Sequence, residues 1–182
     1  MYAQLNKEFK DKIDRLLENC LKRGVEMRIR EGIRHPLIQA NYWRQSRSTG
    51  ETADKIRQLK SGGAAFLAYC LEKAATAPGK HATNAIPGLS WHQWGEAADF
   101  DWMVNGKPCH DTHIKINNLN GYEVYAMEAR RLDLECGFFW TSFPDACHIQ
   151  LRAVQDPSKL YSLQEIDNRM SAFFATDAFL TC

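Results

Sequence analysis

Hydrophobic residues recur with a helical period near the start of the chain, from Asn6 to Arg23. The apolar positions include Phe9, Ile13 and Leu16, which are spaced three or four residues apart, as on one face of a helix. Gly24 follows directly and is a typical helix stop. This pattern predicts a surface helix over the segment.

Apolar spacing, together with proline and glycine, predicts further helices along the chain. We expect one that begins at Pro36, two over residues 52–59 and 64–75 separated by Gly62 and Gly63, one over residues 121–134 ended by Gly137, and a last one that begins at Ser162. Glu165 follows Ser162 by three residues, which is the spacing of a capping box. The stretch 78–89 is predicted to be a loop.

Alternation of apolar and polar residues predicts the strands. From Val25 to Arg30, apolar residues alternate with Glu and Arg, which is the period of a half-buried strand. Further strands are expected at residues 97–104, 138–140 and 147–152, and Asn105–Gly106 is a strong turn signal. Helices and strands are interspersed. The chain is therefore predicted to be a single α+β domain over residues 1–182, with a small, largely antiparallel sheet flanked by helices.

The composition narrows the class of protein. Hydrophobic residues make up 45% of the chain and charged residues 25%, which fits one soluble globular domain with its own core. The formal net charge is +1 with both signs interspersed, so a nucleic-acid partner is not expected. The sequence shows neither a signal-peptide core nor an apolar run of about 18 residues, so we expect a chain made in the cytoplasm without a membrane span. The six cysteines form no CxxC pair and are expected to be reduced and mostly buried, with a disulfide scaffold as the alternative.

The segment SWHQWGEAADFDW, residues 90–102, concentrates the candidate chemistry. In its strand, alternation places Asp99 and Asp101 on one face and the aromatic residues on the other, which must be the core. Asp99 then points away from the core, and Gly95 lets the preceding chain bend so that His92 approaches it. Asp101 shares this face and is the alternative ligand.

The segment PDACHIQLR, residues 144–152, holds a second histidine. Alternation places His148 on the polar side of a strand and assigns Cys147 to the core. If this strand neighbours the first, His148 faces the same polar surface as Asp99. Two histidines and one carboxylate are the protein ligands of a hydrolytic zinc site, which keeps a fourth position for water. Asp145, three residues before His148, is then available as a base.

These segments also carry a family resemblance. The pattern SxHxxGxAxD is reproduced at Ser90, His92, Gly95, Ala97 and Asp99. In this respect the chain resembles the zinc D-alanyl-D-alanine peptidases and carboxypeptidases, a family that includes the vancomycin-resistance dipeptidases and the phage L-alanyl-D-glutamate endolysins. The loop PGKHATNAIPG is similar to the one before this motif in the endolysin-like branch, and EGIRHPLIQ is similar to the family's upstream Arg and Gln segment. The resemblance extends over roughly residues 25–152.

The resemblance implies a role for each matching residue. It implies that one zinc ion is bound by His92, Asp99 and His148. Asp145 would be the general base and acid, and Arg34 would polarise the scissile carbonyl. Substrate binding would fall to Ser90, Arg34 and Gln39. Carboxypeptidases and dipeptidases of the family tend to have Glu three residues before the last histidine, whereas the endolysin-like branch has Asp. Asp145 therefore favours an L-alanyl-D-glutamate endopeptidase that acts, as a monomer, on the peptidoglycan stem peptide.

Other functions and other roles compete with this interpretation. The alternatives are a D-alanyl-D-alanine carboxypeptidase on the same scaffold and a non-catalytic binding protein that contains zinc. Asp145 could be a turn residue and Arg34 a surface ion-pair residue, and CHDTH at residues 109–113 is a rival metal cluster, although a solvated loop is expected there. Three tryptophans could line a groove for a sugar or peptide or pack around the site: Trp91, Trp94 and Trp140.

The chain departs from the family pattern in three places. Residues 49–77 look like an inserted helical pair, FFWTSFPD is shorter than the usual Trp-Gly-Gly-Asp-Trp lead-in, and Ile149–Gln150 replaces the common Phe-Glu, which bears on how the last histidine is supported. A last helix is expected over about residues 162–174. Such an enzyme would reach the wall through a separate membrane pore, as in phage or prophage lysis, or act on cytosolic muropeptides.

Overall fold

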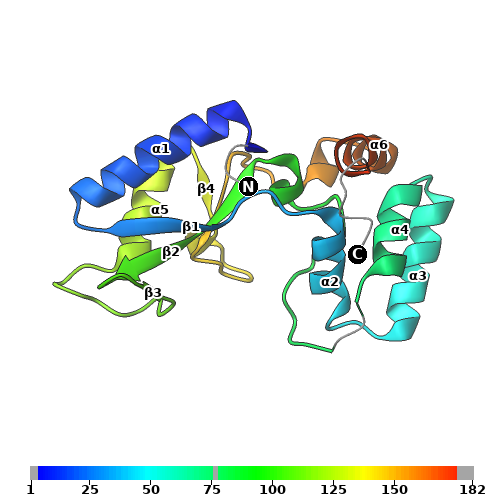
Figure 1. The fold of residues 1–182 in the computed structure, drawn as a ribbon, viewed down its shortest axis with the longest axis horizontal. Helices are drawn as coiled ribbons and strands as arrows, with labels where there is room; N and C mark the ends of the chain where they lie inside the picture. Colours follow the sequence, from blue (N-terminus) through cyan, green and yellow to red (C-terminus); the bar gives the residue numbers. More distant parts are fainter. Residues whose placement is uncertain (1–3, 76–77, 176–182) are drawn as a thin grey trace. The chain divides into compact units, whose positions relative to one another are not determined.

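The computed structural model describes residues 4–75 and 78–175 of the chain (Figure 1). These residues fall into two units, each with its own packing. The first comprises the described residues up to Ile33 together with Trp94–Ala153. The second comprises Arg34–Gln93 and the described residues from Val154 onward.

The first unit is an antiparallel sheet with two helices. Its helices are α1 (Lys7–Lys22) and α5 (Gly121–Arg131), and its strands are β1 (Glu26–Glu31), β2 (Ala97–Val104), β3 (Lys107–Cys109), β4 (Glu135–Cys136) and β5 (His148–Gln150). The strand order is β1-β2-β5-β4, with β3 paired to β2, and every pairing is antiparallel. A short 3-10 helix, η3 (Gly137–Phe139), follows β4. The predicted α+β class with a small antiparallel sheet is confirmed.

The core of this unit lies between the sheet and the two helices. Phe9 and Ile13 of α1 and Tyr125 of α5 are fully buried in one hydrophobic cluster with Phe100 of β2 and Ile149 of β5. Because residues at even spacing on a strand share a face, Ala98, Phe100 and Trp102 all face the helices, as predicted. Asp99 and Asp101 therefore lie on the opposite face of β2.

The second unit is helical. Its elements are α2 (Pro36–Arg44), α3 (Thr49–Ser61), α4 (Ala65–Lys73), η2 (Trp91–Trp94), η4 (Pro157–Lys159) and α6 (Leu163–Phe174). Helix α4 packs against α2, α3 and α6, and the buried Asp167 side chain accepts a hydrogen bond from the Leu67 backbone N–H at 2.8 Å. The inserted pair expected within residues 49–77 corresponds to α3 and α4, and the expected last helix to α6.

Local signals in the sequence account for most of these boundaries. Ser162 and Glu165 form the predicted capping box at the start of α6, and Ser48 and Glu51 form another before α3. The Asn105–Gly106 turn has positive φ angles of 49° and 74°, as a tight hairpin turn requires, and it leads into β3, a strand that the pattern did not predict. The described stretch 78–89 contains neither helix nor strand, as expected.

Two predictions about the segment around Gly137 are wrong. The expected strand at residues 138–140 is the 3-10 helix η3, and the strand that pairs with β5 is the shorter β4 just before it. Helix α5 does not extend to Leu134, because Asp133 takes a positive φ of 54° and ends it. Gly137 has another role, described below.

The described cysteines are free thiols. Cys20, Cys70 and Cys136 are buried, while Cys109 and Cys147 are half-buried, in agreement with the expected reduced state. Cys182 lies outside the described residues. Within the same part of the chain, no helix is both long enough and apolar enough to cross a bilayer.

Candidate metal and active site

Asp99 and His148 face each other on neighbouring strands. Strand β2 pairs with β5 in a register that places Asp99 directly opposite His148. His148 Nδ1 lies 3.2 Å from Asp99 Oδ1, and both side chains are buried. The condition on which the sequence argument depended, that the two strands are neighbours, is met.

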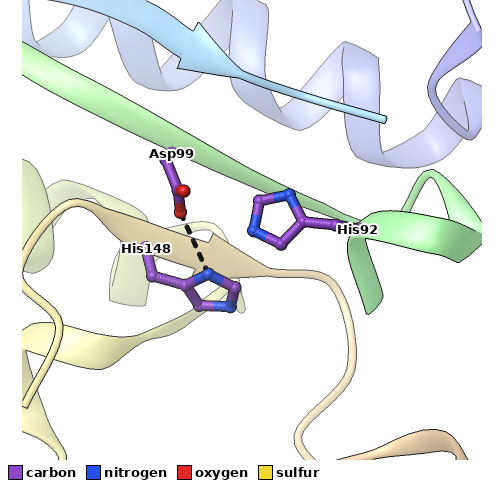
Figure 2. Close-up of side chains that lie close together, drawn as sticks. All are labelled: His92, Asp99 and His148. Carbon is purple, nitrogen blue, oxygen red and sulfur yellow. Dashed lines mark hydrogen bonds and ion pairs between the residues drawn. The ribbon is translucent and has the colours of Figure 1, made fainter. Parts of the chain in front are cut away.

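His92 lies in η2, seven residues before Asp99 on a continuous stretch of chain. The 3-10 turn is closed by a hydrogen bond from the Gln93 N–H to the Ser90 carbonyl at 3.0 Å. Gly95, with a φ of +68°, then turns the chain into β2, as expected from its small size. Figure 2 shows the His92 ring beside the Asp99–His148 pair, and one ligand atom of each residue lies within 4.8 Å of the other two.

The donor set fits a zinc ion. Two ligand atoms about 2.0–2.1 Å from one tetrahedral ion lie about 3.3 Å apart, close to the 3.2 Å between His148 Nδ1 and Asp99 Oδ1. Two buried imidazoles and a buried carboxylate are ordinary zinc ligands. Burial lowers the pKa of His148, but the hydrogen bond and the charge of Asp99 outweigh it, so the pKa is raised above its usual value. The same negative charge that favours a proton here favours a metal cation.

Asp145 lies close to this pair. Its backbone N–H donates to the Gly137 carbonyl at 3.0 Å, and its carbonyl accepts from the His148 N–H at 3.1 Å. An added Cβ at Gly137 would collide with the Asp145 carbonyl, so glycine lets the two backbones approach. Carboxylate oxygens of Asp145 and Asp99 and the Cys147 sulfur lie within 4.8 Å of one another.

Cys147 lies at the edge of the core. Its side chain packs against the hydrophobic cluster, as predicted, but is only half-buried. Its Sγ donates to Asp145 Oδ1 at 2.8 Å and lies 2.9 Å from Arg30 Nη2. Burial and the nearby carboxylates raise the pKa of the Cys147 thiol well above its usual value, which keeps it protonated.

Arg30 was missed as a site residue by the sequence analysis. Alternation in β1 places Arg30 on the polar side of the strand, and the register with β2 shifts beside it, between Ile29 and Glu31. Its guanidinium lies 3.5 Å from Asp99 Oδ2 and 3.2 Å from Asp101 Oδ1. Asp101, the alternative ligand, is therefore an ion-pair partner of Arg30. An arginine on the strand next to two aspartates was the available signal.

Arg34 is held by a network within the second unit. Its backbone N–H donates to the His92 carbonyl at 3.3 Å, and its Nη1 donates to Gln39 Oε1 at 2.9 Å. Gln39 is fully buried, and its Nε2 donates to the Ala85 carbonyl at 2.7 Å. Gln93 Nε2 lies 3.2 Å from the same Gln39 oxygen. The buried Gln39 side chain therefore holds the Arg34 guanidinium in place.

The His148 ring also contacts Trp140 and Gln150. The Trp140 ring packs against the His148 ring at 5.2 Å between centroids, and Trp140 Nε1 donates to Glu135 Oε1 at 3.0 Å. Gln150 Oε1 lies 3.2 Å from His148 Nε2. Trp91, by contrast, is buried in the second unit and donates to the Val154 carbonyl at 3.0 Å. Trp91 thus has the packing role, whereas Trp140 is only half-buried beside His148 and Trp94 is half-buried as well.

The rival cluster at residues 109–113 does not assemble. Among the described residues, the groups able to hold a metal do not include Cys109, His110 or His113. His110 and His113 are exposed, and the His113 backbone N–H donates to the Asp111 side chain at 2.8 Å, as in a solvated loop.

The chain belongs to the VanY family of D-alanyl-D-alanine carboxypeptidases, whose profile matches residues 2–145. Family membership indicates a peptidase that acts on peptidoglycan. The L-Ala D-Glu endopeptidase ChiX of Serratia marcescens has a solved structure that aligns with 83% of this chain and 83% of its own, at 16% identity and a TM-score of 0.44. No curated protein matches the chain.

Proposed function

We propose that the protein is a zinc-dependent endopeptidase that cleaves the L-alanyl-D-glutamate bond of the peptidoglycan stem peptide. The main support is the group of His92, Asp99 and His148, with Asp145 beside it, in a chain of the VanY family. A bound zinc ion supplies Lewis acidity, which polarises a carbonyl oxygen and makes water acidic enough to lose a proton near neutral pH.

The protein's own side chains transfer the protons and bind the substrate. Asp145 accepts a proton from the water whose oxygen attacks the scissile carbonyl carbon, and it returns that proton to the amide nitrogen as the C–N bond breaks. Arg34 donates to the carbonyl oxygen as negative charge develops there, and Gln39 holds the guanidinium in place. Ser90 binds the substrate. Water attacks directly, so no covalent enzyme intermediate forms.

The specificity rests on the residue three positions before His148. It is Asp145, as in the endolysin-like branch, rather than the Glu typical of the carboxypeptidases. The description of the matching family favours the second candidate, a D-alanyl-D-alanine carboxypeptidase on the same scaffold. The two candidates cut different bonds and release different products.

Mass spectrometry of digested peptidoglycan tests the proposal. Purified sacculi and free muropeptides are incubated separately with the protein, which also compares the wall and the cytosol as places of action. An endopeptidase leaves L-alanine on the glycan and releases peptides that begin with D-glutamate, whereas a carboxypeptidase releases D-alanine. Full activity after exhaustive chelation would refute the zinc-dependent mechanism.

Replacement of Asp145 by Asn separates catalysis from metal binding. The variant should keep its zinc, measured by elemental analysis, and lose about 10²–10⁴-fold in turnover, because the amide cannot accept the proton. Asp111→Asn is the matched control, since it makes the same change in the exposed loop at residues 109–113 and should stay fully active. If Asp145→Asn turned over at the wild-type rate, Asp145 would not be the base. If the wild-type protein bound zinc but cleaved no peptidoglycan, the non-catalytic alternative would hold.

A further inference from the structure

Gln150 is buried next to the second histidine of the site. It lies two residues after His148 on β5, so both side chains extend from the same face of the strand. Its side-chain oxygen is 3.2 Å from His148 Nε2, on the opposite edge of the ring from Asp99. The sequence analysis noted this position only because Ile149–Gln150 replaces the Phe-Glu pair that is common in the family.

The orientation of the Gln150 amide follows from its other contact. Gln150 Nε2 donates to the Arg152 carbonyl oxygen at 2.6 Å. A carbonyl oxygen can only accept a hydrogen bond, so the NH2 end of the amide must face Arg152 and the oxygen end must face His148. An oxygen that faces a ring nitrogen requires hydrogen on that nitrogen. His148 is therefore the donor, through Nε2.

The position of this hydrogen decides which ring nitrogen is available to a metal. A neutral imidazole that carries hydrogen on Nε2 has its lone pair on Nδ1. His148 Nδ1 is the atom that lies 3.2 Å from Asp99 Oδ1. By the same rule, without a metal Nδ1 also carries hydrogen, which it donates to the Asp99 carboxylate. A cation that displaces this proton meets the Nδ1 lone pair and the carboxylate in the same small volume, while the hydrogen on Nε2 stays with Gln150.

We propose that Gln150 is a positioning residue that selects Nδ1 of His148 as the metal-binding atom. The packing of Trp140 on the ring fixes its plane, and Gln150 fixes which nitrogen carries the hydrogen. This inference rests on the proposed function, because it takes zinc as the metal at His148. It concerns the coordination of the metal, and so it can be tested without the peptidase reaction.

Zinc affinity tests the role of the acceptor. Gln150→Met removes the acceptor at similar length, whereas Gln150→Glu keeps an oxygen toward the ring. In competition with a chromophoric chelator, Gln150→Met should bind zinc about 10–100-fold more weakly, and Gln150→Glu should stay close to wild type. Thr52→Val is the matched control, because it removes one buried side-chain hydrogen bond in α3, to the Ser48 carbonyl, and should leave the affinity unchanged.

The ring nitrogens can also be observed directly in the wild-type protein, which removes any dependence on how the variants fold. In ¹⁵N NMR spectra of the zinc-loaded protein, His148 Nε2 should carry hydrogen and Nδ1 should be bound to the metal. Coordination through Nε2, or an unchanged affinity in folded Gln150→Met, would overturn the inference. Zinc bound through Nδ1 without any cleavage of peptidoglycan would refute only the proposed function, and a protein that binds no zinc would refute both.

Discussion

The ion pair of Glu96 and Arg152 is expected to hold together the ends of the two strands that carry Asp99 and His148. Arg152 donates through Nε and Nη2 to the two Glu96 carboxylate oxygens at 2.6 and 2.9 Å. Glu96 directly precedes β2, and its carbonyl accepts from the Leu151 N–H at 2.8 Å just after β5. Glu96→Gln removes the charge and one of the two acceptors, so it should loosen this end of the strand pair.

The size of the effect can be worked out from the burial of the two partners. Hydrogen bonds to charged groups contribute about 1.5–3 kcal/mol when they are shielded from water. The Glu96 side chain is 8% exposed but that of Arg152 is 42% exposed, so water screens the pair and reduces its contribution. We therefore expect Glu96→Gln to lower the free energy of unfolding by roughly 2 kcal/mol, or the melting temperature by roughly 4–8 °C.

A double-mutant cycle in urea unfolding checks this reasoning. The cycle combines Glu96→Gln with Arg152→Met and should give a coupling energy of roughly 1–2 kcal/mol. The control pair is Lys7 and Asp11, which are just as close, at 2.7 Å, but 89% and 59% exposed, so their coupling should be at most about 0.5 kcal/mol. A coupling at Glu96–Arg152 no larger than the control would show that burial does not strengthen this pair.

Two glycines give further predictions. Gly137→Ala should lower both stability and turnover, because the added Cβ collides with the Asp145 backbone. Gly50→Ala, where the added Cβ meets open space, should cost nothing in the same melting and turnover assays, and equal losses in the two variants would refute the steric argument. Gly95→Ala should destabilise by about 1–2 kcal/mol, because its φ of +68° is strained for any residue with a Cβ, and zinc affinity should fall with it. An unchanged urea midpoint would contradict that prediction.

The parts of the site that lie on regular strands could be predicted from the sequence. Alternation in β2 separates Asp99 from the aromatic core face, and alternation in β5 places His148 on the polar side, because side chains of a strand point to opposite faces in turn. The sequence could not supply the pairing of these strands by itself, since it depends on contacts between residues about fifty positions apart.

The contributions that the sequence analysis missed depend on strand pairing, on irregular backbone or on the orientation of a side chain. Arg30 lies on the polar side that alternation gives it, but its contacts with Asp99 and Asp101 depend on the pairing of β1 with β2, which alternation does not supply. Gly137 was interpreted as a helix stop. In the structure it begins the 3-10 helix η3, and its lack of a side chain lets the Asp145 backbone approach closely. Gln150 was recognised as a departure from relatives, and its role emerges only once its amide can be oriented by Arg152.

The charges around Asp99 provide an independent reason to expect a cation at this site. Asp99, Asp101 and Asp145 gather here with Arg30 as a cationic neighbour. When both histidines are neutral, as coordination of a metal requires, these four side chains carry two net negative charges. Concentrating like charges on a partly buried face costs free energy, and packed apolar residues would serve stability better. A divalent cation held by His92, Asp99 and His148 would cancel this excess. Bound zinc should therefore raise the stability of the protein, by an amount that follows from its affinity and concentration.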